Sequence, residues 1–192
     1  MANAAKKFSS VFRPGLFNGK VAIVTGGATG IGKTITEELI FLGCKVMIAS
    51  RNEERLQKAA EEMKTMIPSS SSAAIDHIQC NIRKEEQVSL LVHTGAARAG
   101  VDNITKSLSI EWAQDGVRIN SVAPVETAAA NYSDPEIFNR ILPVLPTKRF
   151  GTTEEVSAAV CFLLSPAAAF ITGETLKVDG GGSLYSTVYQ IP

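Results

Sequence analysis

The segment from residue 20 to residue 43 constrains the fold more than any other part of the chain. Residues 20–27, KVAIVTGG, form a short apolar run with β-branched side chains that ends in glycines, which is typical of a central parallel strand buried on both faces. Residues 30–43 follow with apolar side chains at helical spacing and stop at Gly43. These helix-spaced side chains are Ile31, Ile35, Leu39 and Leu42. The sequence therefore predicts a strand that leads into a helix through a glycine turn.

The same alternation continues to residue 82. Residues 44–51, CKVMIASR, predict a second strand, residues 52–66 predict an amphipathic helix, and residues 74–82 predict a third strand. Strands that alternate with helices in this way are typical of α/β folds, in which right-handed crossovers build a parallel sheet. We therefore expect a Rossmann-like, doubly wound parallel sheet.

The second half of the chain predicts more helix than strand. We expect helices over residues 84–92, 95–115 and 153–164, and strands over residues 117–124 and 174–182. The second of these helices carries four apolar residues on one face: Val101, Ile104, Leu108 and Trp112. Thr152 followed by Glu155 fits a capping box that opens the last helix. Residues 125–150 are expected to form a long loop with a short helix.

The composition is that of a single globular domain. A chain of 192 residues that is 45% hydrophobic can bury one core, so we expect one domain over residues 1–192, with residues 1–18 as a flexible lead-in. Basic and acidic residues balance at 19 each, so no net field attracts nucleic acid. The three cysteines lie far apart without metal-type spacing, and we predict no metal site. The longest apolar run, residues 156–164, is about half of a membrane span.

Residues 25–32, TGGATGIG, have the features that a dinucleotide pyrophosphate requires. Glycines allow a tight turn and close approach of the backbone, and the start of a helix supplies free N–H groups with a favourable dipole. A plain glycine turn is the alternative, but the flanking strand and helix favour a cofactor loop. The predicted cofactor contacts are Gly26, Thr29, Gly30, Ile31 and Gly32.

The end of the second strand indicates which dinucleotide is bound. A ribose 2′-hydroxyl is usually held by an acidic side chain at this point, whereas a 2′-phosphate requires a cation. The chain offers Ser50 and Arg51 there, and its first acid is Glu53. The planar guanidinium of Arg51 matches a phosphate, so we predict NADP(H) as the cofactor. The alternative is that Arg51 is only a solvated charge.

Several stretches together resemble a known family. They are the TGGATGIG loop with its GxxxGxG spacing, ITKSL, RINSVAP, RFGTTEEVSAAVCFLLSP and ITGETLKVDGG. In this order they resemble the landmarks of the short-chain dehydrogenase/reductase family over nearly the whole chain. The resemblance implies an NADP-dependent oxidoreductase and places Cys80 and Asn81 along the adenine. The alternative is that Cys80 belongs to the core and Asn81 closes the third strand.

Within that family, the stretches LFNGKVAIVTGGATGIGK, VMIASR, IQCNIR, HTGAARAGV and GGGSLY resemble the branch of peroxisomal trans-2-enoyl-CoA reductases. The resemblance implies transfer of a hydride from NADPH to C3 of an enoyl-CoA thioester and protonation at C2. It also implies a homo-oligomer and a peroxisomal location. The ending YQIP lacks a Ser-Lys-Leu-like tripeptide, which leaves the cytoplasm as the alternative location.

The expected catalytic helix lacks the tyrosine of the family's Tyr-x-x-x-Lys pair. One register gives Thr94 and Arg98, and the register of the enoyl-CoA reductase branch gives Asp102 and Lys106. An aspartate beside a lysine is held in its charged form, so Asp102 is a poor proton donor. We therefore favour a solvated i, i+4 ladder of Arg98, Asp102 and Lys106 over a working site, and expect impaired activity.

The chain between the third strand and this helix is too short for the family pattern. Only residues 83–94 remain where the family places two more strands with their helices, including a catalytic serine. One βαβ unit takes about 30 residues or more, so about two units are missing. We expect a shortened sheet of about five strands, with residues 117–124 beside residues 20–27 and one face thinly covered. A catalytically silent nucleotide-binding module that pairs with a full-length subunit is the alternative function, and a poorly folding fragment is the third.

Overall fold

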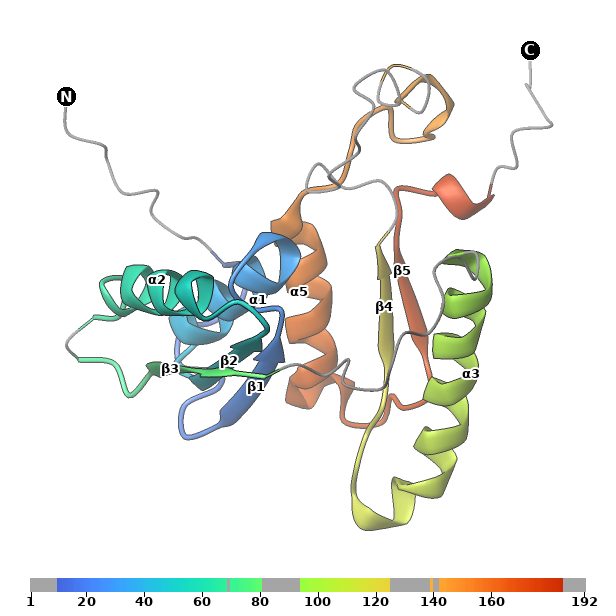
Figure 1. Ribbon diagram of the computed structural model, residues 1–192. Coiled ribbons are helices and arrows are strands. Elements are labelled where there is room, and N and C mark those ends of the chain that lie inside the picture. The colour runs from blue at the N-terminus through green and yellow to red at the C-terminus, as the bar shows by residue number, and fades with distance from the viewer. Residues whose placement is uncertain (1–9, 69, 81–93, 125–138, 140–141, 185–192) are drawn as a thin grey trace. The chain divides into compact units, whose positions relative to one another are not determined.

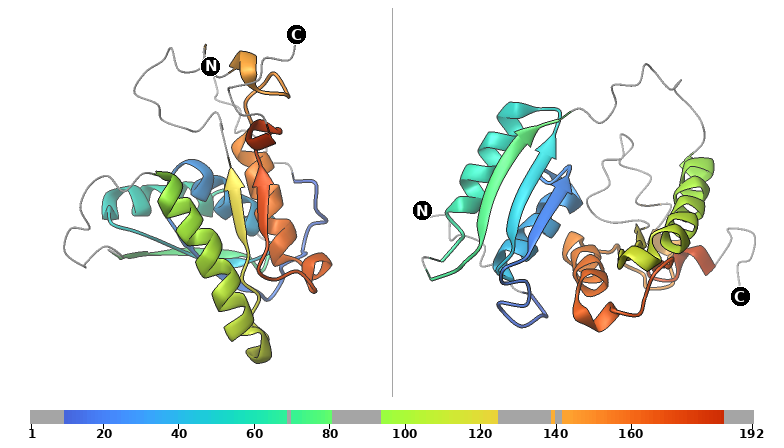
Figure 2. Two further views of the ribbon diagram at one scale, coloured as in Figure 1. Left: turned by 90° about the vertical axis from the view of Figure 1, so that its right-hand side faces the viewer. Right: turned by 90° about the horizontal axis from the view of Figure 1, so that it is seen from below.

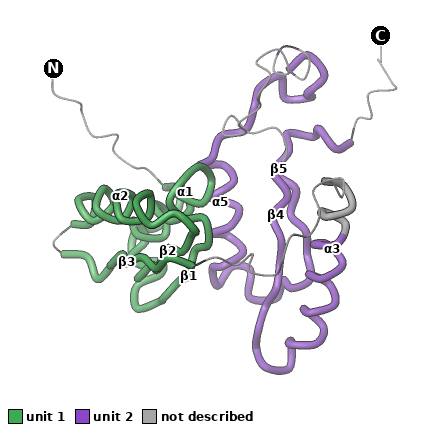
Figure 3. The backbone as a smooth tube through the Cα atoms, viewed as in Figure 1, with its two compact units in different colours: residues 1–84 green, residues 85–192 purple. Residues whose placement is uncertain are grey.

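The computed structural model describes residues 10–68, 70–80, 94–124, 139 and 142–184. The chain divides into two compact units, residues 1–84 and residues 85–192, as Figure 3 shows. Each unit is considered by itself. Our expectation of one domain over the whole chain stays a prediction.

The first unit is a three-stranded parallel sheet with two helices (Figure 1). Its elements are β1 (Val21–Thr25), α1 (Gly30–Phe41), β2 (Lys45–Ser50), α2 (Glu53–Lys64) and β3 (Ala74–Gln79). The strands lie in the order β1-β2-β3, with Val21 opposite Lys45 and Lys45 opposite Ala74. All five elements fall where the sequence predicts them, so the first half of the fold is confirmed.

Both helices of this unit cover the same face of the sheet (Figure 2). The crossovers β1-α1-β2 and β2-α2-β3 step in the same direction, and their right-handedness places both helices on one side. The core between helices and sheet is apolar and almost completely buried. It consists of Leu39, Leu42, Val46, Ile48, Leu56, Ala60, Met63 and Ile75.

The opposite face of this sheet carries exposed apolar side chains. Val21 and Ile23 are each 73% exposed and Ile78 is 54% exposed. They share a face because side chains alternate along a strand and Ile78 lies opposite Ala49, which lies opposite Thr25. This face of the three-stranded sheet therefore leaves apolar side chains exposed, and the thinly covered face of a five-stranded sheet stays a prediction.

The second unit contains two parallel strands between two helices. Its main elements are α3 (Thr94–Glu111), β4 (Ser121–Pro124), α5 (Thr153–Leu164) and β5 (Thr175–Val178), with short 3-10 turns at Ala113–Asp115, Leu142–Val144, Pro166–Ala168 and Gly182–Leu184. β4 pairs with β5 from Ser121 opposite Thr175 to Pro124 opposite Val178. Figures 1 and 2 show α3 and α5 on opposite faces of this pair.

Together the described residues form five parallel-paired strands in an α/β arrangement, which confirms the predicted fold class. The pairing of β4 with β1 stays a prediction, and the helix expected over residues 84–92 lies outside the described residues. No helix in the described part of the chain is long and apolar enough to cross a membrane.

The stretch RINSVAP anchors the second unit through polar side chains. The guanidinium of Arg118 donates to the carbonyl oxygens of Leu163 and Ile171, at 2.8 and 3.3 Å. The Asn120 side-chain amide donates to the Ile171 carbonyl at 3.0 Å and accepts from the Glu174 N–H at 3.1 Å. These contacts join the start of β4 to the end of α5 and to the segment before β5, so the stretch has a structural role.

The face that α3 packs against the sheet differs from the predicted one. Thr105 and Ser109 are buried, with 5% and 4% exposure, whereas Val101 and Ile104 are 53% and 58% exposed. Small side chains allow the backbone to come close: a Cβ at Gly173 would lie 2.7 Å from the Ser109 hydroxyl. That hydroxyl donates to the Lys106 carbonyl and is therefore satisfied. The apolar stripe of α3 lies beside the packed face rather than on it.

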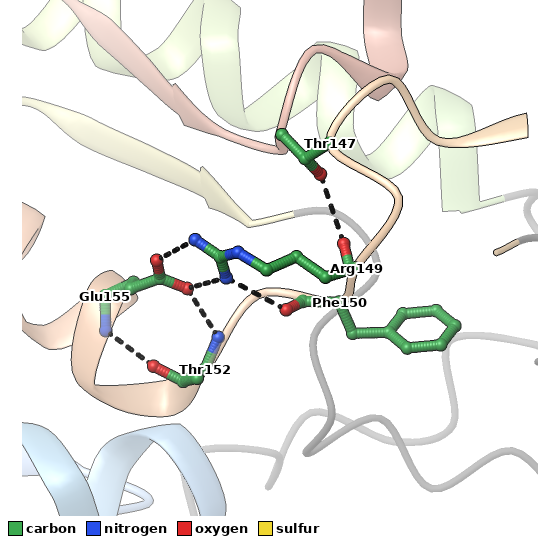
Figure 4. Close-up of polar contacts among 5 residues, drawn as sticks. All are labelled: Thr147, Arg149, Phe150, Thr152 and Glu155. Carbon is green, nitrogen blue, oxygen red and sulfur yellow. Dashed lines mark hydrogen bonds and ion pairs between the residues drawn. The ribbon is translucent and has the colours of Figure 1, made fainter.

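The loop before α5 is tied to the start of the helix by one carboxylate (Figure 4). Glu155 accepts from both terminal nitrogens of Arg149 and from the Thr152 N–H, and the Thr152 hydroxyl accepts from the Glu155 N–H. The predicted capping box is confirmed. Thr147 donates to the Arg149 carbonyl at 3.1 Å, and Arg149 donates to the Phe150 carbonyl at 3.1 Å. The loop is therefore fixed in one conformation over the helix start.

The Arg149–Glu155 contact generates a pH-dependence prediction. The Arg149 hydrogen bond, followed by that from Thr152, lowers the pKa of Glu155 from about 4.5 to about 2. A lowered pKa in the folded state stabilises the fold at pH values above the unfolded pKa, and this stabilisation disappears as the pH falls from 4.5 towards 2. Thermal unfolding should show Glu155→Gln less stable by under about 1 kcal/mol near neutrality, because the pair is exposed, with the difference vanishing at the acidic end.

The matched control is Glu54→Gln, which removes the same charge from the first turn of α2. Glu54 forms no ion pair within the described residues. A pH-independent difference for Glu155→Gln, or an equal acid-dependent difference for Glu54→Gln, would contradict the assignment.

Candidate functional site

The turn between β1 and α1 exposes its backbone to a ligand. Gly26 and Gly30 have φ angles of +73° and +53°, in the left-handed region that side-chain-bearing residues rarely adopt. Nothing lies within 4 Å of the position that a Cβ would take at either glycine. The turn therefore offers open backbone on both sides of Thr29, where the sequence predicts a pyrophosphate.

Two other glycines allow the turn to pack tightly. A Cβ on Gly32 would lie 2.4 Å from the carbonyl oxygen of Gly26, and a Cβ on Gly27 would lie 2.6 Å from the side chain of Ile48. Contacts this short are not tolerated, so only glycine fits at these positions. Gly32 brings the first turn of α1 directly over the glycine turn, which places the helix start at the end of β1.

The start of α1 keeps its donors available. Thr29 is the N-cap residue in an extended conformation, and its side chain makes no capping hydrogen bond within the described residues. The first N–H groups of a helix have no partner inside the helix. The N–H groups of Gly30, Ile31 and Gly32 are in this first turn. With the helix dipole they form a site suited to a phosphate group.

The turn between β2 and α2 forms the other wall of the same cavity. The cavity measures about 490 Å³, and its lining residues are Gly26, Ala28, Thr29, Ser50, Arg51, Asn52 and Arg55. Two arginines and no acid are among them. The carbonyl of Ala49 accepts from the Gly26 N–H at 2.7 Å, which ties the two walls together. A hydroxyl and two guanidiniums beside an open glycine turn are a donor set that fits a phosphorylated ribose.

Sequence reasoning found Ser50 and Arg51 but missed Asn52 and Arg55. The side chain of Asn52 accepts from the Arg55 N–H at 2.8 Å and so caps α2. This cap starts the helix immediately after Arg51, which brings Arg55 back to the cavity one turn later. The sequence did contain a signal for Arg55. It lies four residues after Arg51, across a predicted helix start, so one helical turn returns it to the side of Arg51.

Cys80 is exposed, although its position in an apolar run favours a buried side chain. Its thiol is exposed, while Cys44 and Cys161 are buried, so the reading of Cys80 as a core residue is wrong. Its N–H donates to the Ser50 carbonyl at 2.8 Å and extends the pairing of β3 with β2. Cys80 does not line the cavity, and Asn81 lies outside the described residues. Within the described residues no group of His, Cys, Asp and Glu is arranged to hold a metal ion.

The predicted catalytic residues all belong to α3, but they are not brought together as a described site. Asp102 is half-buried and Lys106 is exposed. Arg98 and Thr94 belong to the helix, and their side chains lie outside the described part. All three tyrosines of the chain, Tyr132, Tyr185 and Tyr189, fall outside the described residues as well.

The Asp102 carboxylate is an acceptor in a chain of polar contacts. The Thr175 hydroxyl donates to Asp102 Oδ1 at 2.9 Å, and the Ser121 hydroxyl lies 2.8 Å from the Thr175 hydroxyl. Because Thr175 uses its only hydroxyl hydrogen for the carboxylate, Ser121 must donate to Thr175. The three side chains therefore connect α3 to the first residues of β4 and β5. This gives Asp102 a structural function that sequence reasoning did not predict.

A second cavity of about 410 Å³ lies beside the end of β5 and the loop before α5. Its two carboxylates already have partners: Glu155 binds Arg149, and Asp179 accepts from the N–H groups of Gly181 and Ser183. A hydrogen bond from the Ser183 side chain, with smaller contributions from the N–H groups of Gly181 and Ser183 and from the charge of Lys177, lowers the pKa of Asp179. These groups stabilise the loop and the turn after β5, so we assign no chemistry to this cavity.

Comparison with protein families gives two adjoining matches. A family described as short chain dehydrogenase matches residues 20–98, and one described as enoyl-(acyl carrier protein) reductase matches residues 91–183. Among curated proteins, a tropinone reductase homolog of Arabidopsis thaliana is 28% identical over 252 aligned positions, which cover 90% of this chain and 96% of the relative. Peroxisomal 2,4-dienoyl-CoA reductases of Saccharomyces cerevisiae and Danio rerio are each 26% identical, covering 88% and 94% of this chain and 86% and 87% of their own.

Solved structures agree with the fold. A citronellol catabolism dehydrogenase of Pseudomonas aeruginosa is 29% identical with a TM-score of 0.73, covering 92% of this chain and all of its own. A 3-oxoacyl-[acyl-carrier protein] reductase of Brucella melitensis, at 16% identity and a TM-score of 0.77, covers 91% of this chain and 97% of its own and shares the fold. The alignment with the Arabidopsis relative spans 252 positions but uses 90% of 192 residues, so roughly 80 positions of that relative have no counterpart here. The chain is therefore shortened relative to that protein, as the sequence predicts.

The close contact of Gly32 predicts a position-specific effect of alanine. Gly32→Ala should reduce the free energy of unfolding by about 2 kcal/mol or more, because its Cβ would meet the Gly26 carbonyl at 2.4 Å. Gly100→Ala, in α3 with nothing within 4 Å, should leave stability unchanged or raise it by about 0.5 kcal/mol. Denaturant unfolding of both variants measures this, and equal effects would show that the turn is not tightly packed.

The Asp102–Thr175 hydrogen bond predicts a coupling between the two residues. Thr175→Val and Asp102→Ala should each destabilise the protein by about 1 kcal/mol, and the double variant should lose little more than either single variant. A double-mutant cycle by denaturant unfolding measures the coupling. Additive effects would mean that the two side chains do not interact in solution.

Proposed function

Because the chain belongs to the short-chain dehydrogenase/reductase family, we propose that it binds NADPH in the cavity of the first unit and is a slow reductase of trans-2-enoyl-CoA thioesters. The family is one of oxidoreductases that use nicotinamide cofactors. The observation that carries the proposal is the pair of arginines, Arg51 and Arg55, in a cavity that the glycine turn completes.

The preference for NADPH over NADH follows from the charges of this cavity. A 2′-phosphate brings two negative charges near Arg51 and Arg55, and guanidiniums bind phosphate oxygens through paired N–H groups. An unphosphorylated ribose would instead require an acceptor for its 2′-hydroxyl, and the described residues that line the cavity include no carboxylate. Ser50 adds a neutral hydroxyl at the same wall. The glycine turn and the first turn of α1 then receive the pyrophosphate through backbone N–H groups.

The substrate class rests on the resemblance of sequence stretches and on relatives. Two relatives are named as peroxisomal 2,4-dienoyl-CoA reductases, and the second half of the chain matches the enoyl-(acyl carrier protein) reductase family. Bound NADPH would supply a hydride to a carbon–carbon double bond that is polarised by a thioester carbonyl. The chain itself has to orient the thioester and deliver a proton. Asp102 accepts a hydrogen bond from Thr175 that joins α3 to β5, and α3 contains no tyrosine, which is why we propose slow turnover.

A catalytically silent NADP(H)-binding module is the second candidate. Two observations favour it: the only acid in the predicted catalytic pair is used to join α3 to β5, and roughly 80 positions of a full-length relative have no counterpart here. The glycine turn and the arginine pair are complete without those positions. In this case the chain would bind cofactor alone and act by pairing with a full-length subunit.

We extend the proposal to the compartment. The names of the yeast and zebrafish relatives place those proteins in peroxisomes, and we propose the same location for this chain. A fluorescent fusion joined at the N-terminus should co-localise with a peroxisomal marker. A diffuse cytoplasmic signal would contradict this part of the proposal.

Thermal unfolding with each cofactor tests the binding proposal. A ligand that binds only the folded state raises its stability, by about 2.7 kcal/mol at a concentration 100 times its Kd. NADPH should therefore raise the Tm by more than NADH does at the same concentration. In Arg51→Asp the NADPH shift should fall to the size of the NADH shift, because the phosphate then meets a carboxylate. Equal losses for both cofactors would refute the assignment of Arg51 to the 2′-phosphate.

Turnover separates the two candidate functions. NADPH oxidation by the purified chain should be measured with trans-2-enoyl-CoA thioesters of several chain lengths. Slow oxidation that saturates with substrate supports the reductase. Cofactor binding without oxidation, together with co-purification of a tagged full-length relative, supports the silent module.

A further inference from the structure

Two side chains of β3 contact the turn that carries the arginines. The side-chain amide of Gln79 donates to the carbonyl oxygen of Arg51 at 3.0 Å. The Nε2 atom of His77 lies 3.2 Å from a carboxylate oxygen of Glu53, the first residue of α2. Neither Gln79 nor His77 lines the cavity, so both act on the cavity only through the turn.

The hydrogen bond from Gln79 to Arg51 lies directly after the last paired residues of β2 and β3. Ser50 is the last residue of β2 and lies opposite Gln79, and the Ser50 carbonyl already accepts from the Cys80 N–H. The next carbonyl along the chain, that of Arg51, leaves the ladder and is captured by the Gln79 side chain. The backbone of Arg51 is thereby held at the strand edge, which fixes the point from which its guanidinium reaches into the cavity.

The contact from His77 fixes the first turn of α2. The facing Glu53 carboxylate is an acceptor, so Nε2 of His77 carries the hydrogen of this contact. The Nδ1 atom is buried without a hydrogen-bond partner in the described residues, and Asp76 Oδ1, at 3.9 Å, is beyond hydrogen-bond distance. A buried nitrogen without a hydrogen-bond partner is unfavourable. The contact with Glu53 is the favourable interaction that offsets this cost of a histidine at position 77.

The contact between His77 and Glu53 also keeps a negative charge out of the cavity lining. Glu53 is the acid nearest in sequence to Arg51, and a carboxylate that reached the cavity would repel a phosphate. Its contact with His77 keeps it on the β3 side of the turn, and it is absent from the cavity lining. The Asn52 cap then places Arg55 one turn into α2. Three polar contacts therefore hold the segment from Arg51 to Arg55, from which the two guanidiniums extend.

We propose that Gln79 and His77 are positioning residues that set the cofactor preference of this site. They hold the segment from Arg51 to Arg55 in the conformation that receives a 2′-phosphate, so that binding requires little reordering of the turn. This inference rests on the proposed NADPH site. It predicts that removing either contact weakens the binding of NADPH more than the binding of NADH, because only NADPH has a 2′-phosphate that contacts the arginines.

The test is a titration of the full chain with NADPH and with NADH, followed by cofactor fluorescence. Gln79→Met keeps the length of the side chain and removes its N–H, and it should raise the Kd for NADPH about fivefold, the factor that one neutral hydrogen bond is worth. The Kd for NADH should change by less than about twofold. Gln57→Met is the matched control: its amide contacts Glu61 on the exposed side of α2, and both constants should stay unchanged.

His77→Phe and His77→Gln form the second arm. Phenylalanine keeps a planar ring and removes both nitrogens, including the buried one without a partner, so thermal stability should be retained while the Kd for NADPH rises about threefold. Glutamine can again donate to Glu53 and should restore the NADPH preference. A purely structural role of His77 would change the Tm without changing the ratio of the two constants.

Arg51→Ala separates failure of the inference from failure of the proposed site. If Arg51→Ala lowers the NADPH preference while Gln79→Met and His77→Phe leave it unchanged, the positioning role is wrong and the site stands. If those two variants weaken NADPH and NADH equally, the positioning role is also wrong. If Arg51→Ala itself leaves the preference unchanged, both the site and the positioning role are overturned.

Discussion

The glycine turn of the proposed cofactor site depends on the close approach of α1 to that turn. Gly32 places the backbone of the helix so near the Gly26 carbonyl that no side chain fits between them. This contact sets the start of α1 beside the glycine turn at the end of β1, and Gly26, Ala28 and Thr29 of that turn line the cavity. The Ala49 carbonyl then joins the turn to β2, whose end carries Arg51. A phosphate site thus follows from the packing of a strand, a turn and a helix.

The two units differ in how many of the predicted site features they contain. The first unit keeps every element that its glycine turn and arginine turn require, because its contacts run only between neighbouring strands and helices. In the second unit, α3 packs through Thr105 and Ser109 and leaves Val101 and Ile104 exposed, and Asp102 is part of a polar connection to the strands. The cofactor site that we propose and the expected proton donor therefore lie in different units, and within the described residues only the proposed cofactor site has its predicted elements.

Sequence patterns predicted the elements whose cause is local. The β-branched run of β1, the helix spacing of α1 and the capping box at Thr152 each depend on neighbouring residues, and each was found where it was expected. The packed face of α3 could not be predicted. The sequence pattern identifies the apolar stripe with Val101 and Ile104, whereas the helix packs closely through the small side chains of Thr105 and Ser109. Arg55 and Gln79 were missed for a related reason: their functions depend on a helix cap and a strand edge that meet only after folding.

Amide hydrogen exchange with and without NADPH tests most directly whether the glycine turn and the arginine turn hold the phosphorylated end of the cofactor. NADPH should slow exchange in residues 26–33 and 50–55, NADH should protect the second of these segments less, and exchange in residues 145–151 should stay unchanged. Equal protection of residues 50–55 by NADPH and NADH, or no protection of either segment by NADPH in a folded chain, would contradict it.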